Sequence, residues 1–157
     1  MRVIGIDPGY DRLGVAILEG DVHVQTLIFS TCIHTDKTTS LPKRLHEMGA
    51  SLQKIFTEYK PERLAIETLF FNKNVKTALN VAEARGIILF VAQTAGAEVL
   101  EYSPQAIKIA VTGHGASQKE QVETMVKRLV TNIPTTALDD EYDAIAVAIT
   151  GLVSGAR

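Results

Sequence analysis

Short apolar runs alternate along the chain with longer segments of helical periodicity, and this pattern predicts a mixed α/β fold. Residues 2–6 are continuously apolar, which is typical of a strand that is buried on both faces. Residues 13–18 and 22–33 have the composition of two further strands. The Glu-Gly-Asp tripeptide that begins at Glu19 separates them and predicts a tight turn. We therefore expect three consecutive antiparallel strands near the N-terminus.

The rest of the chain predicts helices separated by single strands. Apolar residues recur at helical spacing from Leu41 to Tyr59, with Ser40 as a plausible N-cap and Pro61 just after the end. The later elements, in chain order, are a strand at 63–67, a helix at 74–94, a strand at 98–102, a helix at 104–111, a helix opening with a capping box at Ser117, and a last helix at 139–153. This order indicates a mixed sheet with helices on its faces.

Composition narrows the class of protein. The chain has 157 residues, of which 46% are apolar, so it fits one domain with a substantial core. We expect no membrane span, no secretion signal and, because Cys32 is the only cysteine, no internal disulfide; together these fit a cytoplasmic protein. A net charge of −2 argues against a general nucleic-acid coat, although residues 37–85 carry nine Lys and Arg against five Glu.

Four carboxylates at the ends of apolar segments are the candidate chemistry. Asp7 ends the first apolar run, Glu67 ends another, and Asp140 and Asp143 open the last apolar segment. Acidic side chains at the ends of buried elements are costly unless a positive charge meets them. If they converge, their oxygens suit Mg²⁺ or Mn²⁺ rather than zinc, and a pair of such ions is the usual means of cutting a phosphodiester.

Each acid also has an ordinary structural interpretation. Asp7 precedes a Pro-Gly turn and could bond the turn backbone, while Asp139 and Asp140 could simply complement the dipole of the last helix. Glu67 has apolar residues on both sides, and Asp143 precedes a helix that is apolar all round, so both are harder to explain in this way. Spacing does not decide between Asp139 and Asp140.

Seven short motifs occur in a fixed order: Gly5-Ile6-Asp7-Pro8-Gly9, Ala65-Ile66-Glu67 with Phe70 and Asn72-Lys73-Asn74 after it, Ala78-Leu79, Ala84-Arg85-Gly86, Gly113-His114-Gly115-Ala116, Lys119-Glu120-Gln121-Val122, and Asp140-Glu141-Tyr142-Asp143-Ala144. In this order and at these separations, they resemble the RuvC family of Holliday-junction resolvases over nearly the whole chain. The chain departs from the common family pattern at Leu13, at Ala82 and in its additional acid Asp11.

The resemblance implies a fold and a metal site. The fold would be RNase H-like, a five-stranded mixed sheet flanked by helices, in a single domain of residues 1–157. In that fold the ends of the first and fourth strands meet the start of the last helix. Asp7, Glu67, Asp140 and Asp143 would then bind two Mg²⁺, with Mn²⁺ as a substitute, and the match aligns Asp140 rather than Asp139 with the family's first acid of the final pair.

DNA contacts are predicted partly by the resemblance and partly by the residues. Lys108 and Lys119 match family lysines that lie at the DNA and support catalysis, and Phe70 matches an aromatic near the junction's crossover. Two adjacent aromatics on a strand-to-helix turn cannot easily both be buried, so one could stack on a base. The full predicted set is Phe70, Phe71, Lys73, Lys76, Lys108 and Lys119, with Lys119 also catalytic.

The resemblance further implies a homodimer that makes two symmetric nicks in a four-way DNA junction and leaves 5′-phosphate and 3′-hydroxyl ends. A RuvA–RuvB branch-migration complex is the implied partner. We expect the apolar face of the helix at 74–94, with Val75, Ala78, Leu79 and Ala82, to contribute to the dimer. Three alternative hypotheses stay open. The first is an actin-like phosphotransferase, since such proteins begin with a similar glycine-rich loop. The others are a junction-binding protein without catalysis and an RNA-processing protein of related fold.

Overall fold

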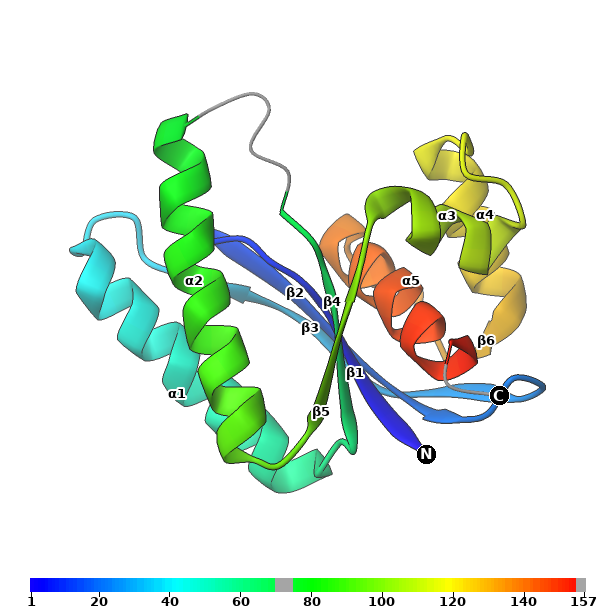
Figure 1. The fold of residues 1–157 in the computed structure, drawn as a ribbon, viewed down its shortest axis with the longest axis horizontal. Coiled ribbons are helices and arrows are strands. Elements are labelled where there is room, and N and C mark those ends of the chain that lie inside the picture. The colour runs from blue at the N-terminus through cyan, green and yellow to red at the C-terminus, as the bar shows by residue number, and fades with distance from the viewer. Residues whose placement is uncertain (70–74, 155–157) are drawn as a thin grey trace.

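The computed structural model describes residues 1–69 and 75–154, with only the backbone at residues 75 and 76. A mixed sheet forms its centre, with the strand order β5-β4-β1-β2-β3-β6 (Figure 1). The strands are β1 (Arg2–Asp7), β2 (Arg12–Gly20), β3 (Gln25–His34), β4 (Arg63–Glu67), β5 (Glu98–Tyr102) and β6 (Val130–Thr131). The helices are α1 (Leu41–Tyr59), α2 (Val75–Thr94), α3 (Pro104–Thr112), α4 (Lys119–Leu129) and α5 (Asp139–Val153).

The five predicted strands are present, and a sixth was missed. β1, β2 and β3 pair in antiparallel fashion, which confirms the expected meander. β4 lies parallel to β1, and β5 lies parallel to β4. The additional strand, β6, is only two residues long and runs parallel to the start of β3. A strand this short has no periodicity that a sequence pattern could reveal.

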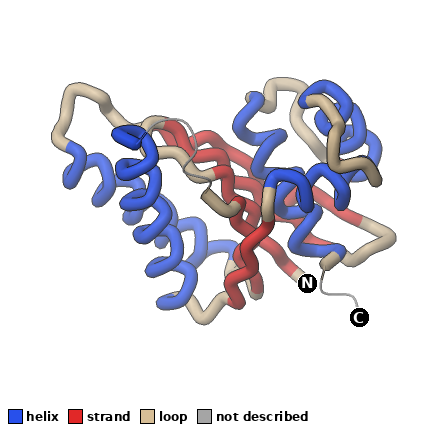
Figure 2. The backbone as a smooth tube through the Cα atoms, turned by 45° about the horizontal axis from the view of Figure 1, so that its top comes forward, coloured by secondary structure: helices blue, strands red, loops and turns tan. Residues whose placement is uncertain are grey.

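Helices cover both faces of the sheet (Figures 1 and 2). α1 and α2 pack on one face, and α3, α4 and α5 lie on the other. Side chains alternate across β1, so Ile4 and Ile6 join the core under α1 and α2, whereas Val3 joins the core under α5. This two-sided burial explains why the first strand is apolar without alternation.

α5 lies unusually close to the sheet because glycines face it. A Cβ added at Gly5 would stand 2.3 Å from the carbonyl oxygen of Ala144, and one at Gly14 would stand 2.2 Å from the carbonyl oxygen of Asp140. Every residue from Ala144 to Leu152 is buried, as expected for a helix that is apolar on all sides. The close approach fixes where the acidic first turn of α5 lies relative to β1 and β2.

The capping box of α4 begins one residue later than predicted. Gln118 is the N-cap, and its backbone N–H donates to Oε1 of Gln121 at 2.8 Å. The Ser117 hydroxyl bonds the carbonyl oxygen of His114 and the hydroxyl of Thr112, so it closes the preceding loop instead. Lys119 is therefore the first residue of the helix.

α2 is apolar on more than one side. Its packed face carries Ala84, Ile88, Val91 and Ala92, all buried against the sheet and α1. Leu79 and Phe90, by contrast, are 61% and 64% exposed on the outer side. The apolar face that the sequence suggested around Leu79 is therefore not the one that packs in the core. Among the described residues, no helix combines the length and the hydropathy needed to cross a membrane.

Candidate active site

The carboxyl ends of two adjacent parallel strands place the first two acids. β1 and β4 run side by side with Ile6 opposite Ile66, so Asp7 and Glu67 follow at the same level. Because side chains alternate and Val3 and Ala65 face α5, Asp7 and Glu67 must face α5 as well. The two carboxylates therefore lie on the same face of the sheet, at the carboxyl ends of neighbouring strands.

The first turn of α5 brings the other two acids to the same place. Gly14 of β2 is the pairing partner of Asp7 on the neighbouring strand. The face of Gly14 that would carry a Cβ packs directly against the backbone of Asp140. Asp143 stands one turn further along the helix. The electrostatic interactions agree with this placement, because Asp7 is repelled by both Asp143 and Asp140, and Glu67 is repelled by Asp7 and Asp143.

A cleft of about 240 Å³ opens between these acids and the helices α3 and α4. It contains three of the four predicted carboxylates and two of the predicted lysines, Lys108 and Lys119. Its lining residues are Asp7, Glu67, Pro104, Ile107, Lys108, Lys119, Val122, Asp143, Ala146 and Val147. Asp140 lies beside the cleft rather than in its wall.

Burial and mutual repulsion perturb the acids of the cleft. Burial, followed by repulsion from Asp143 and Asp140, raises the pKa of Asp7 to about 6. Burial, followed by Asp7 and Asp143, raises the pKa of Glu67 to about 7, although Lys108 opposes the rise. The pKa of Asp143 is also raised by burial, against the opposing effect of Lys119. The cleft thus concentrates negative charge that its own lysines only partly offset.

Two basic side chains pair with the acids of α5. Nζ of Lys119 lies 3.1 Å from Oδ2 of Asp143 and 3.6 Å from Oδ2 of Asp139, and the bond to Asp143 raises the lysine's pKa. Nη2 of Arg12 lies 2.9 Å from Oδ2 of Asp140. Arg12 was not among the site residues predicted from the sequence. Its place two residues before Gly14, on the same face of β2, is the signal that could have found it.

The donor set is chemically suited to a hard divalent cation, because it consists of carboxylate oxygens that repel one another. The oxygens are partly engaged, however. Asp140 accepts bonds from Arg12 and, at 3.7 Å, from Sγ of Cys32, and Asp143 accepts one from Lys119. Within the described chain, no group of three or more Asp, Glu, His or Cys side chains is arranged so that it could hold a metal ion as it stands. A cation would need Arg12 and Lys119 to yield these oxygens.

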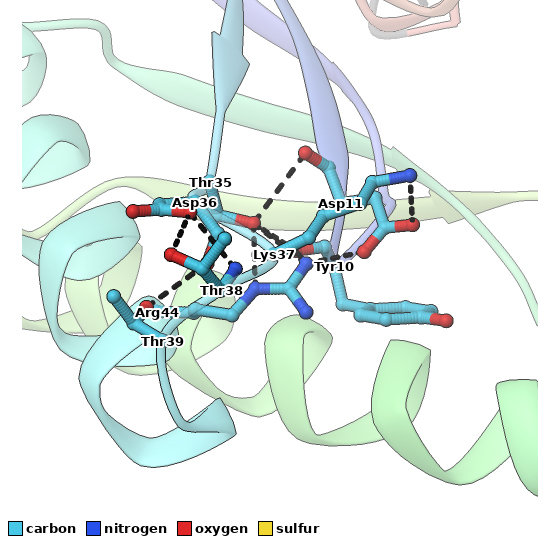
Figure 3. Close-up of polar contacts among 8 residues, drawn as sticks. All are labelled: Tyr10, Asp11, Thr35, Asp36, Lys37, Thr38, Thr39 and Arg44. Atoms are coloured by element: carbon cyan, nitrogen blue, oxygen red, sulfur yellow. Dashed lines mark hydrogen bonds and ion pairs between the residues drawn. The ribbon is translucent and has the colours of Figure 1, made fainter.

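Asp11, the additional acid of this chain, does not belong to the cleft. Figure 3 shows it bonded to Arg44 and Lys37, which come from α1 and the loop before it. These bonds, chiefly the one from Arg44, lower the pKa of Asp11. Arg44 is only 8% exposed and also donates to the hydroxyl of Thr35 and the carbonyl oxygen of Tyr10. Asp11 is therefore part of a clamp on the β1–β2 loop.

The remaining candidate residues divide into two groups. The side chain of Asp139 is 75% exposed, whereas that of Asp140 is 17% exposed, so the two acids that spacing could not separate differ clearly in the fold. Phe70, Phe71 and Lys73 lie outside the described residues, as does the side chain of Lys76. The predicted DNA contacts in that segment stay predictions.

The fold and the acidic cleft define the class of RNase H-like nucleases. A structure of T. thermophilus RuvC in complex with a Holliday junction substrate has a TM-score of 0.93 to this chain, at 29% identity, covering 99% of this chain and 94% of that one. The family model for crossover junction endodeoxyribonuclease RuvC matches residues 3–151. The chain therefore belongs to the RuvC family of crossover junction endodeoxyribonucleases.

Two relatives illustrate the similarity in sequence. A crossover junction endodeoxyribonuclease RuvC of Petrotoga mobilis is 42% identical over 148 residues, which cover 94% of this chain and 91% of the relative. A protein of the same description from Thermosipho melanesiensis is 43% identical, with 94% of each chain covered. The match thus extends over nearly the full length on both sides, as the sequence motifs indicated.

Proposed function

We propose that this protein resolves four-way DNA junctions by hydrolysing phosphodiester bonds at the cleft between β1, β4 and α5. The observation that carries the proposal is the convergence of acids from these three elements, with Lys108 and Lys119 in the same wall. A relative of this fold was solved with a Holliday junction. The alternative of a junction-binding protein without catalysis gives no reason for a concentration of buried, mutually repelling carboxylates.

We assign the metal to the four carboxylates. Asp7, Glu67, Asp140 and Asp143 would hold two Mg²⁺, with Mn²⁺ as a substitute, and the ions would supply an activated water and stabilise the leaving 3′ oxygen. The raised pKa values of Asp7 and Glu67 support this assignment, because burial and then mutual repulsion disfavour their charged forms, and the nearby lysines only partly offset this. A cation would offset that repulsion and keep both acids ionised at neutral pH.

The lysines act on the DNA phosphate. Lys119 begins α4, where the helix dipole disfavours a cation, and it is held there by the carboxylate of Asp143. A bound DNA phosphate can replace Asp143 as the partner of Lys119. The lysine would then offset the negative charge that develops on the phosphate during bond cleavage. Lys108 lines the same cleft as Glu67, attracts its carboxylate electrostatically and can orient the same phosphate. Phe70, Phe71, Lys73 and Lys76 are the predicted contacts near the crossover.

Two cuts need two equivalent sites, and a twofold dimer supplies them. We propose that α2 provides part of the dimer contact, because Leu79 and Phe90 leave its outer side apolar and exposed. Each protomer would then make one nick, leaving a 5′-phosphate and a 3′-hydroxyl.

The wider setting is also a proposal. Residues 1–157 would form one nuclease domain that works in the cytoplasm, where a lone Cys32 stays reduced. A RuvA–RuvB branch-migration complex is the partner that the family suggests.

A direct assay compares a synthetic four-way junction with a linear duplex of the same sequence. The protein is given each DNA with Mg²⁺, with Mn²⁺ and with chelator. We expect paired, symmetric nicks in the junction alone, and none with chelator. Equal cutting of both DNAs would refute junction selectivity while sparing the nuclease. Asp7→Asn, which must remove the cutting, controls for a contaminating nuclease.

A further inference from the structure

Arg85 of α2 joins the ends of two neighbouring strands, β4 and β5. Its Nη1 donates to the backbone carbonyl oxygen of Glu67 at 2.9 Å. Its Nη2 lies 2.6 Å from Oε2 of Glu101 on the neighbouring strand β5. The arginine side chain is only 12% exposed, whereas that of Glu101 is 48% exposed, so the bond to Glu67 is the better shielded of the two. A shielded, charge-assisted bond restrains its partners more strongly than one at the surface.

Arg85 contacts Glu67, a proposed catalytic residue, from the face of the sheet opposite to the cleft. The carboxylate of Glu67 faces α5, whereas α2 lies on the opposite face of the sheet (Figure 1). Arg85 therefore grips the main chain of Glu67 without entering the cleft. β4 ends at Glu67, and past it the main chain is held to β5 through Thr68, whose N–H donates to Tyr102 at 2.8 Å. Arg85 ties this strand end to a helix.

We propose that Arg85 is a positioning residue for Glu67: it fixes the end of β4, and so the carboxylate, relative to α2. This inference rests on the proposed function. It also links the cleft to the outer side of α2, where Leu79 and Phe90 form the proposed dimer contact. A displacement of α2 would reach Glu67 through the guanidinium of Arg85, so a partner protomer bound to α2 would influence the geometry of the cleft.

The same strand carries a matched control. Arg63, at the start of β4, is also 12% exposed at its side chain, pairs with a glutamate of β5 (Glu98, 2.8 Å) and donates to a backbone carbonyl oxygen (Gly151, 2.8 Å). It makes the same kinds of bond as Arg85, but at the opposite end of the strand from Glu67. A purely structural role predicts equal consequences for the two arginines.

The test compares Arg85→Met, Arg85→Lys and Arg63→Met in the full chain. Junction affinity is measured in chelator, the cleavage rate at saturating junction with Mg²⁺, and stability by urea unfolding. We expect Arg85→Met to lose about tenfold or more in cleavage rate with affinity changed less than about twofold, since small misplacements of reacting groups are costly. Arg85→Lys, which keeps one donor, should recover part of the rate. Arg63→Met should lose stability but cleave within about threefold of the unmodified protein.

Equal cleavage by Arg85→Met and Arg63→Met would overturn the inference. If Arg85→Met does not fold, Arg85→Lys decides, because a full wild-type rate without the second guanidinium contact would equally refute a positioning role. Failure of the proposed function has a different signature: the unmodified protein and Arg63→Met would both leave the junction uncut.

Discussion

Substitution of Gly14 should displace two of the four acids while leaving the rest of the fold intact. A Cβ added by Gly14→Ala would stand 2.2 Å from the carbonyl oxygen of Asp140, about 1.2 Å short of the 3.4 Å at which ordinary contact begins. The new Cβ would collide with the backbone of Asp140, which cannot rotate out of the way as a side chain could. The first turn of α5 must therefore move away from β2 by a comparable amount. Asp140 and Asp143 move with it, while Asp7 and Glu67 stay on the sheet.

The expected result has two parts. Overpacking of this kind costs about 1–3 kcal/mol of folding free energy, and a displacement near 1 Å at a reacting centre costs about 100-fold in rate. Urea unfolding measures the first quantity, and cleavage of a four-way junction at saturation measures the second. Both should fall in Gly14→Ala, and the rate should fall more than the loss of folded protein explains.

Gly151→Ala provides the control at the other end of the same helix. There the new Cβ would meet Cβ of Ala65 and Cγ1 of Val3, both at 2.7 Å. It should destabilise the protein by about 1–3 kcal/mol yet leave the acidic first turn of α5 in place. If Gly14→Ala cleaves as fast as Gly151→Ala, the argument that the close approach of β2 to α5 sets the site is wrong.

Three further predictions concern single residues. Folded-state pKa values of about 6 for Asp7 and about 7 for Glu67 exceed the ordinary values, so in chelator ionisation should cost stability as the pH rises from 4 to 8. Asp7→Asn should remove about 3 kcal/mol of that loss; an unchanged pH profile in urea unfolding would contradict this. Phe90→Glu should shift the proposed dimer to monomer in light scattering, since it charges the exposed side of α2; an unaltered mass would exclude this surface. Asp11→Asn should cleave within about twofold of the unmodified protein, because Asp11 serves the Arg44 clamp; a large loss would return it to the site.

Periodicity was sufficient to predict most of the elements. The strand at residues 63–67 and the helices from Leu41 and Asp139 fall where the apolar pattern put them, because burial of one face or of all faces leaves a regular trace in the sequence. β6 left no such trace, since a two-residue strand is defined only by its partner β3. The N-cap of α4 was misplaced because Ser117 satisfies the capping pattern as well as Gln118 does, and only the loop contact to His114 decides between them.

The acids of the candidate site stand out in the sequence, but their surroundings do not. Asp7 and Glu67 end apolar runs, which is a local signal. Arg12 and Arg85 act through partners that are 128 and 18 residues away in sequence. Arg85 belongs to one of the seven motifs and Arg12 stands two residues before Gly14, but neither pattern identifies the partner residue. The additional acid Asp11 is close to Asp7 in sequence, but it pairs with Arg44 and Lys37 and does not line the cleft, and only the fold shows this.

The central claim is that Asp7, Glu67, Asp140 and Asp143 form one metal-dependent cutting site. Cleavage of a four-way junction with Mg²⁺, at a protein concentration that saturates binding, tests it in the four single amide variants beside Asp139→Asn. The matched acid Asp139 precedes Asp140 directly but is 75% exposed. We predict that each of the four loses about 1,000-fold or more in rate, while Asp139→Asn cleaves normally. Wild-type cleavage by any of the four, or a comparable loss in Asp139→Asn, would contradict the claim.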